Sequence, residues 1–310
     1  MKIPDIRTSS SAVALATLAI YACGWSTQAS GSTGKIAFAG PGKKSTFAFG
    51  WRKGMIFVPV RINGSRPLSF VLDTGSTRNI IDRGLAKALG LQAAGAGSLQ
   101  GAGAGRIPVA FIHEVSITLP GIESQGHEFS TADLQPLAGS LGVVVDGILG
   151  YEIFSRFVVT VDYKARRLTF TLPEAFQPAS GSAQVLPIEL RDKWAFVKGE
   201  LVLPGPVTVQ DSFLIDSGSS DAVDHPIVMN LQSRTPAASG VGLGAPMQGA
   251  TAQATSFRLG RFTVDGPVVS CCGATDATSR LIGNEVLRRF TVTFDYPSSR
   301  MFLTPNSDFE

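Results

Sequence analysis

The chain reads Ser69-Phe-Val-Leu-Asp-Thr-Gly75 in its first half and Ser212-Phe-Leu-Ile-Asp-Ser-Gly218 in its second. In both stretches an apolar run leads into an aspartate, which a hydroxyl residue and a glycine follow. Two carboxylates that lie a few ångströms apart cannot both ionise, so they share a proton and act together as base and acid. The repeated acids, Asp73 and Asp216, are therefore the candidate active site.

The repeat continues downstream of each triplet. Residues 146–163 read Asp-Gly-Ile-Leu-Gly-Tyr-Glu-Ile-Phe-Ser-Arg-Phe-Val-Val-Thr-Val-Asp-Tyr, and residues 280–296 read Arg-Leu-Ile-Gly-Asn-Glu-Val-Leu-Arg-Arg-Phe-Thr-Val-Thr-Phe-Asp-Tyr. Self-similarity over such a long period is the signature of a duplicated structural unit. The chain of 310 residues is long enough for two such units, each with its own core.

With these motifs the chain resembles the aspartic proteases, both the two-lobed pepsin-like enzymes and the retropepsin-like family with its bacterial relatives. In that family each lobe supplies an Asp-Thr/Ser-Gly loop and an apolar-apolar-Gly element that passes beneath it. Residues 148–150 (Ile-Leu-Gly) and 281–283 (Leu-Ile-Gly) match the second element. The resemblance extends from about Phe57 to the C-terminus. It implies an all-β, two-lobed acid-protease fold in which each lobe is a compact β-barrel-like unit, with few short helices.

The resemblance also implies a role for each residue near the two acids. Asp73 and Asp216 would activate a water for hydrolysis of a peptide bond. The hydroxyl residues of the triplets would brace the two loops, the glycine amides would approach the acids, and the serines that follow would bond the outer carboxylate oxygens. These supporting residues are Thr74, Gly75, Ser76, Ser217, Gly218 and Ser219.

A glycine-rich stretch, residues 95–105, lies between the first aspartate and Gly150. By resemblance this region is a hairpin flap that closes over the substrate, and Gly101, Gly103 and Gly105 are its candidate residues. Glycine suits a backbone that flexes and approaches a peptide closely, although such stretches are also plain flexible loops. No tyrosine occurs between Ser98 and Phe111, so the flap resembles the retroviral type. Residues 239–245 are the candidate counterpart in the second half.

Local patterns predict the elements around these motifs. Asn63-Gly64 predicts a hairpin between strands at 55–62 and 68–72. Strands are expected again at 195–203 and 212–215, joined through a Pro-Gly-Pro turn. Asp82 is expected to cap a helix over 83–89 that stops at Gly90. Shorter helices are expected at 152–156 and 285–289.

The predicted division of the chain is a signal peptide at 1–29, an N-terminal segment at 30–54, an N-terminal lobe at 55–175, a linker at 176–190 and a C-terminal lobe at 191–310. Lys2 and Arg7 precede an apolar stretch at 12–23 that is short for a membrane span and typical of a secretory signal. Export to the periplasm or medium is expected, with a mature chain that starts near Ser30. Lipoprotein processing at Cys23 is the alternative.

Two features near the termini keep more than one interpretation. The basic residues of segment 30–54, around positions 43–53, indicate a solvated edge strand or a short pro-segment. The adjacent pair Cys271 and Cys272 indicates either a strained vicinal disulfide or two small buried residues in a strand.

Other chemistries find less support in the sequence. A net charge of +3 with 16% charged residues, and no basic stripe, give no sign of nucleic-acid binding. His113-Glu114 and His127-Glu128 lack the second histidine of a zinc protease motif and are expected at the surface. No Gly-x-Ser-x-Gly nominates a serine nucleophile. We therefore expect no metal or cofactor, peptide or protein substrates, and a monomer, because both lobes lie on one chain. The alternative is a non-catalytic peptide-binding protein of the same fold.

Overall fold

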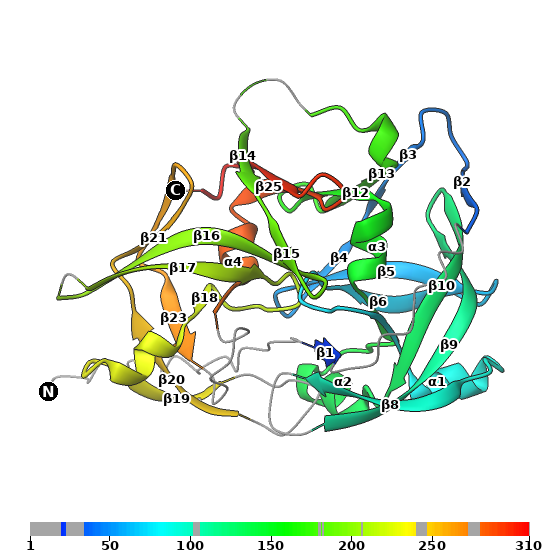
Figure 1. Cartoon of the computed structure of the whole chain (residues 1–310), viewed down its shortest axis with the longest axis horizontal. Helices are drawn as coiled ribbons and strands as arrows, with labels where there is room; N and C mark the ends of the chain where they lie inside the picture. The colour runs from blue at the N-terminus through cyan, green and yellow to red at the C-terminus, as the bar shows by residue number, and fades with distance from the viewer. Residues whose placement is uncertain are drawn as a thin grey trace, which may run out of the picture.

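The structure is a computed structural model, which describes residues 20–22, 34–101, 106–178, 181, 183–205, 207–239, 247–271 and 280–309. Two β-lobes lie side by side, and a third sheet runs along the top of the view in Figure 1. Helices are few and short, so the all-β prediction is confirmed. None of the helices within the described ranges is both long and apolar enough to cross a bilayer.

The first lobe is built on one mixed sheet. In the described part of the chain its strand order is β1-β8-β9-β10-β7-β11-β6-β5-β4, and β2 pairs with β10. The strands are β1 (Ile20–Ala22), β2 (Ile36–Phe38), β4 (Gly50–Arg52), β5 (Met55–Ile62), β6 (Leu68–Leu72), β7 (Asn79–Asp82), β8 (Ala94–Gly101), β9 (Arg106–Leu119), β10 (Ile122–Ala132) and β11 (Gly147–Leu149). Helices α1 (Arg83–Ala88) and α2 (Gln135–Leu141) flank it.

The second lobe repeats this arrangement. Its described strands follow the order β19-β20-β23-β18-β24-β17-β16-β21-β22, and β15 pairs with β16. They are β15 (Glu189–Arg191), β16 (Trp194–Leu203), β17 (Val207–Ile215), β18 (Val223–Asp224), β19 (Thr235–Ser239), β20 (Met247–Gln253), β21 (Ser256–Leu259), β22 (Phe262–Asp265), β23 (Val268–Cys271) and β24 (Leu281–Ile282). A 3-10 helix, η2 (Pro226–Asn230), and α4 (Asn284–Leu287) complete the lobe.

The third sheet takes strands from both halves of the chain, in the order β14-β26-β25-β12-β13-β3. The strands are β3 (Lys44–Ala48), β12 (Val158–Asp162), β13 (Arg167–Thr171), β14 (Gln184–Pro187), β25 (Phe290–Asp295) and β26 (Arg300–Pro305). Helix α3 (Tyr151–Arg156) precedes β12, and the 3-10 helix η1 (Pro173–Ala175) follows β13. At the centre β12 pairs antiparallel with β25, so the repeated segments lie against each other.

The predicted hairpins are confirmed, and their turns explain them. Strands β5 and β6 pair antiparallel, with Phe57 opposite Val71. Asn63 and Gly64 between them have positive φ angles of 46° and 78°, which asparagine and glycine adopt most readily. In the second lobe β16 and β17 pair along their length, from Phe196 opposite Leu214 onward.

The predicted short helices are also present. The Asp82 side chain accepts a hydrogen bond from the Leu85 amide at the start of α1, and Gly90 follows the helix with a φ of 68°. Helices α3 and α4 each begin directly after the glycine of an apolar-apolar-Gly element. In each lobe a single glycine thus connects a buried strand to a short helix that is partly buried.

Three segments differ from a simple two-lobe division. Strand β3 forms one edge of the third sheet, as the edge-strand interpretation of segment 30–54 predicts. The predicted linker 176–190 contains β14 and the start of β15, so much of it is regular structure. Residues 20–22 of the predicted signal peptide form β1 beside β8. Most of that leader, including Cys23, lies outside the described residues, and export stays a prediction.

A large apolar core fills both lobes and continues under the third sheet. It includes fully buried phenylalanines from each lobe and from the sheet between them. Phe154 of α3 packs edge-on against Phe294 of β25, with ring centroids 5.7 Å apart. Because residues from both halves share this core, the lobes form one packed body.

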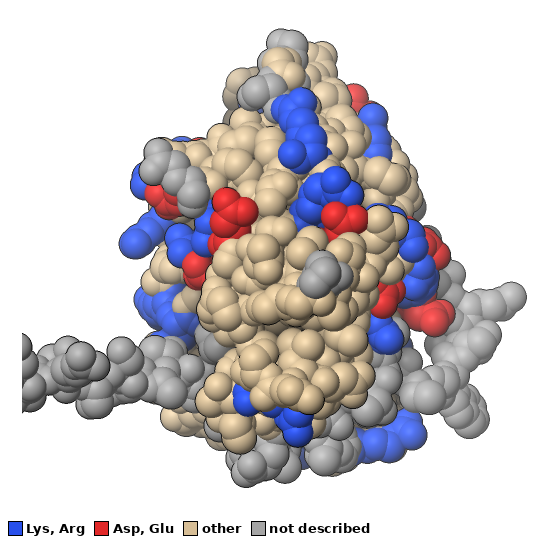
Figure 2. All heavy atoms as spheres, turned by 90° about the vertical axis from the view of Figure 1, so that its left-hand side faces the viewer, with Lys and Arg blue, Asp and Glu red and all other residues tan. Residues whose placement is uncertain are grey.

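Charges on the outer face of the second lobe are mixed. Figure 2 shows that face, with basic and acidic side chains interspersed among uncharged residues. This distribution agrees with the small net charge of the chain.

Candidate active site

The two aspartates lie at the ends of equivalent strands. Asp73 follows β6, and its amide donates a hydrogen bond of 2.9 Å to the Leu149 carbonyl. Asp216 follows β17, and its amide donates a hydrogen bond of 3.0 Å to the Ile282 carbonyl. Each apolar-apolar-Gly element therefore holds the aspartate loop of its own lobe.

The hydroxyl residues of the triplets join the two loops to each other. Thr74 Oγ1 donates to the Ile215 carbonyl at 2.7 Å, and Ser217 Oγ donates to the Leu72 carbonyl at 2.9 Å. Each hydroxyl also accepts a hydrogen bond from the amide of the other residue, at 2.8 and 3.0 Å. These four buried hydrogen bonds fix the loops in a two-fold related arrangement.

The glycines bring each loop against the opposite carboxyl group. A Cβ atom on Gly75 would lie 2.7 Å from Asp216 Cγ, and one on Gly218 would lie 2.5 Å from Asp73 Cγ. Carbon atoms do not approach so closely, so any side chain at these positions would displace the acids. The two carboxyl groups thus meet where both triplets lack side chains.

Both acids are completely buried and similarly bonded. The Gly75 amide donates to Asp73 Oδ1, and the Gly218 amide donates to Asp216 Oδ1, both at 2.8 Å. Neither Oδ2 atom has a hydrogen-bond partner among the described residues. A buried oxygen without a partner is costly, so these two atoms are the natural ligands of a water or a substrate.

Burial dominates the electrostatics of the pair. It raises the pKa of Asp73 well above the usual value, and the charge of Asp216 raises it further. Burial raises the pKa of Asp216 to about 6, against the opposing effect of the Gly218 amide. A pair in this setting holds one proton over a range of pH that reaches toward neutrality.

Comparison with known families agrees with this geometry. Residues 58–153 match the family model described as aspartyl protease. This part of the chain, which lies in the first lobe, is similar to an aspartyl protease domain. The match ends before Asp216, so Asp216 is paired with Asp73 through the internal repeat and through its place beside Asp73. A search of curated proteins gave no match.

Of the two serines that follow the triplets, Ser76 differs from the expectation. The Ser76 hydroxyl donates to the Arg78 carbonyl at 2.7 Å, not to Asp73, so the predicted bond to the outer carboxylate oxygen is wrong. The Ser219 hydroxyl accepts a hydrogen bond from the Asp221 amide at 3.1 Å. In both lobes the serine hydroxyl group therefore bonds to a backbone group two residues further along the chain.

Asn284, which none of the sequence motifs identifies, supports the loop that carries Asp216. Its amide nitrogen donates to the carbonyls of Ser217 and Gly54, at 2.7 and 2.8 Å, and its oxygen accepts from the Tyr163 hydroxyl at 2.9 Å. Asn284 therefore joins the loop that carries Asp216 to both halves of the chain. Its place directly after Gly283 was the available signal.

Trp194 is a second residue that the sequence analysis missed. Its indole Nε1 donates to the Gly75 carbonyl at 3.0 Å, across from one lobe to the catalytic loop of the other.

The flap region is a hairpin, formed by β8 and β9. Gly101 ends β8, whereas Gly103 and Gly105 lie outside the described residues. Leu99 and Val109 of this hairpin pack in one apolar cluster with Phe57 and Ile148. In the second lobe β19 and β20 form the corresponding hairpin, and most of the segment 239–245 at its tip is likewise outside the described residues.

Two histidines and one cysteine have defined surroundings in the described part of the chain. His113 is exposed and contacts Glu128 at 3.0 Å, as expected. His127 is fully buried, so its predicted surface position is wrong, and burial lowers its pKa to about 3. Cys271 is buried at the end of β23, and Cys272 lies outside the described residues, so the vicinal pair stays a prediction.

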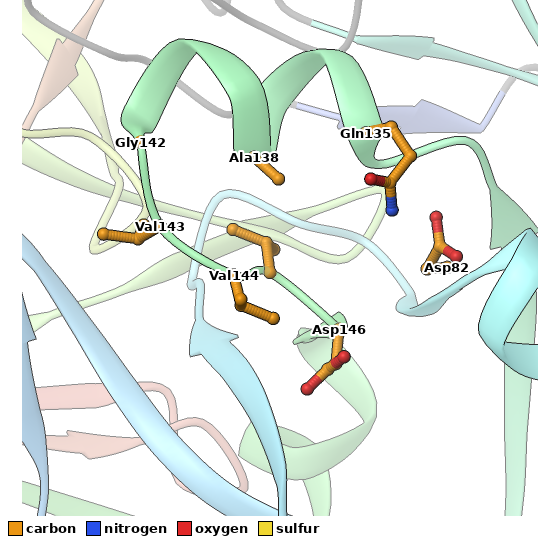
Figure 3. A pocket seen from close by; sticks show the side chains of 8 residues that line it. Asp82, Gln135, Ala138, Gly142, Val143, Val144 and Asp146 are labelled. Carbon is orange, nitrogen blue, oxygen red and sulfur yellow. The ribbon is translucent and has the colours of Figure 1, made fainter.

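A surface pocket lies apart from the dyad, between α2 and the start of β11 (Figure 3). Its carboxylates already hold backbone amides. Asp82 caps α1 and also accepts from the Leu134 amide, and Asp146 accepts from the Ser69 amide at 2.7 Å. Neither catalytic aspartate lines the pocket, and its polar groups stabilise the fold.

Proposed function

We propose that the protein is an aspartic endopeptidase, in which a water activated between Asp73 and Asp216 hydrolyses a peptide bond. One observation carries the proposal: two carboxyl groups, fully buried and related by two-fold symmetry, each keep one unpartnered oxygen within the described structure. Turn residues need no such burial. The aspartyl protease match over the first lobe supports the same activity.

The chemistry follows from the shared proton. The ionised carboxylate removes a proton from the water as its oxygen attacks the carbonyl carbon, and the protonated carboxyl donates to the carbonyl oxygen. Collapse of the tetrahedral intermediate then breaks the C–N bond and releases an amine and a carboxylic acid. No covalent bond to the enzyme forms. Because burial raises the pKa of both acids, we expect the singly protonated pair, and hence activity, to persist to about pH 6 or above.

The alternative is a peptide-binding protein of the same fold without catalysis, since a fold alone does not imply activity. The intact symmetry of the two acids favours the enzyme, because binding alone needs no pair of buried carboxyl groups.

The test is cleavage of a mixed peptide library from acidic to neutral pH. Wild-type protein is compared with Asp73→Asn, Asp216→Asn and the control Asp265→Asn, which changes an exposed acid on β22. We expect both dyad variants to lose turnover by at least 1,000-fold, and the control to retain it. Cleavage that survives either dyad substitution would assign the chemistry to another site. Peptide binding without cleavage by any protein would support the alternative.

A further inference from the structure

The two lobes present equivalent faces, with one exception. In the first lobe, strand register places four side chains opposite one another on one face of the sheet, and in the second lobe the same register places four more. The first set is Phe57, Val71, Ile148 and Ile80, and the second is Phe196, Leu214, Leu281 and Asp224. Three positions are apolar in both lobes. At the fourth, an aspartate in the second lobe replaces the isoleucine of the first.

In the second lobe this face is linked to the loop that carries Asp73. In the first lobe the flap hairpin covers it, through Leu99 and Val109. In the second lobe Trp194 packs against the cluster of Phe196, Leu214 and Leu281. Its indole N–H donates a hydrogen bond to the Gly75 carbonyl, in the loop that carries Asp73. The opposite face of β18 carries Val223, which belongs to the large core. Asp224 therefore lies on the side of its sheet where the catalytic loops meet.

Asp224 is an unusual occupant of such a face. Its side chain is 1% exposed, and its Oδ1 atom has no hydrogen-bond partner within the described residues. Burial raises its pKa well above the usual value, and the charge of Asp221, a side-chain hydrogen bond with Asp221 and the charge of Asp216 add to this effect. A buried carboxyl without a full set of partners is destabilising, so a ligand that supplies donors and positive charge would relieve the cost.

We propose that Asp224 is a specificity residue that binds a lysine or arginine side chain of the substrate beside the scissile bond. The inference rests on the proposed peptidase function. A cationic side chain would donate hydrogen bonds to the carboxylate, while its aliphatic stem would contact Leu214 and Leu281 on the same face. Because Ile80 occupies the equivalent position, the cationic preference applies on one side of the scissile bond and an apolar preference on the other.

The experiment uses pairs of peptides that differ at one position. In a peptide that the wild-type protein cleaves, each residue on either side of the scissile bond is replaced in turn by lysine or by norleucine, which has a similar length and no charge. We expect wild-type kcat/KM to favour lysine over norleucine at one position by roughly tenfold to a hundredfold, the range for a hydrogen bond to a charged group.

The variants separate charge from shape. Asp224→Asn keeps the size of the side chain, and Asp224→Ile copies the first lobe. In both, the ratio of kcat/KM for the lysine peptide to kcat/KM for the norleucine peptide should fall to about one, and Asp265→Asn should keep the wild-type ratio. Equal cleavage of the two peptides by wild type, or a preference that survives in Asp224→Asn, would overturn the proposal.

A binding measurement keeps this inference apart from the proposed function. Fluorescence anisotropy of the labelled lysine and norleucine peptides on Asp73→Asn reports recognition without turnover. Tighter binding of the lysine peptide, lost in Asp73→Asn combined with Asp224→Asn, supports the specificity role even if no protein cleaves the peptides. Equal binding of both peptides contradicts it even if cleavage occurs.

Discussion

At the scale of the residue, burial of the two aspartates lowers the free energy of unfolding. Asp73 and Asp216 are fully buried, and each carboxyl group keeps an oxygen without a partner in the described structure. Burial of an acid favours its neutral form. The same property that lets the pair share a proton thus makes the folded protein less stable once the pair has to ionise.

This cost predicts a pH-dependent gain in stability for Asp216→Asn. The pKa of Asp216 is raised from 3.8 to about 6 in the folded protein. The folded state therefore holds the proton more tightly than the unfolded chain, and stability is lost as pH rises from about 4 through 6. We expect the variant to be more stable than wild type by on the order of 1–3 kcal/mol at pH 7.5.

Urea unfolding at pH 7.5 and pH 3.5 measures this difference. The two proteins should unfold alike at the lower pH, because asparagine resembles the protonated acid. A variant that is equally or less stable at pH 7.5 would contradict the assignment of a raised pKa to Asp216.

At the scale of the element, the catalytic loops depend on hydrogen bonds between lobes. Thr74 and Ser217 exchange amide and hydroxyl hydrogen bonds and also reach the carbonyls of Ile215 and Leu72. Every one of these bonds joins one half of the chain to the other. The relative position of Asp73 and Asp216 therefore depends on the contact between the two loops.

Thr74→Val tests this contact, because valine keeps the shape of threonine without the hydroxyl. The change leaves the buried amide of Ser217 and the carbonyl of Ile215 without their partner. We expect a loss of about 2–4 kcal/mol of unfolding free energy, from two buried groups left unpaired, together with reduced kcat. Thr74→Ser, which restores the hydroxyl, should recover most of both in urea unfolding and peptide assays. Equal stability of the valine and serine variants would show that the hydroxyl does not brace the loops.

Much of this arrangement is readable from the sequence, for a physical reason. The triplets and the apolar-apolar-Gly elements are local patterns that occur twice, so their repetition predicts equivalent loops. Hairpins at Asn63-Gly64 and the cap at Asp82 follow from backbone preferences of single residues. The role of Trp194 could not be found in this way, because its partner Gly75 lies in the other half of the chain, and two of the three partners of Asn284 lie there as well. Burial of His127 was missed because it depends on packing against Ser124 and Glu152, which no local motif indicates.

At the scale of the whole molecule, the third sheet divides evenly between the halves of the chain. Strands β3, β13 and β12 come from the first half, and β25, β26 and β14 come from the second. The boundary falls between β12 and β25, where Thr160 and Thr293 face each other with their hydroxyl oxygens 2.8 Å apart. The repeated segments meet there in antiparallel pairing, with Val161 opposite Val292.

The third sheet joins the two halves of the chain in the way that an interface joins the two subunits of a dimer. The connection between the halves runs through 176–183 and lies between η1 and β14. When fragments 34–178 and 183–310 are coexpressed, they should therefore associate into an active complex. Each fragment alone should lack activity, because it holds only one of the two aspartates Asp73 and Asp216. Copurification through a tag on one fragment, followed by the peptide assay, measures this. Fragments that fold separately and never associate would show that the covalent link, and not the shared sheet, keeps the lobes together.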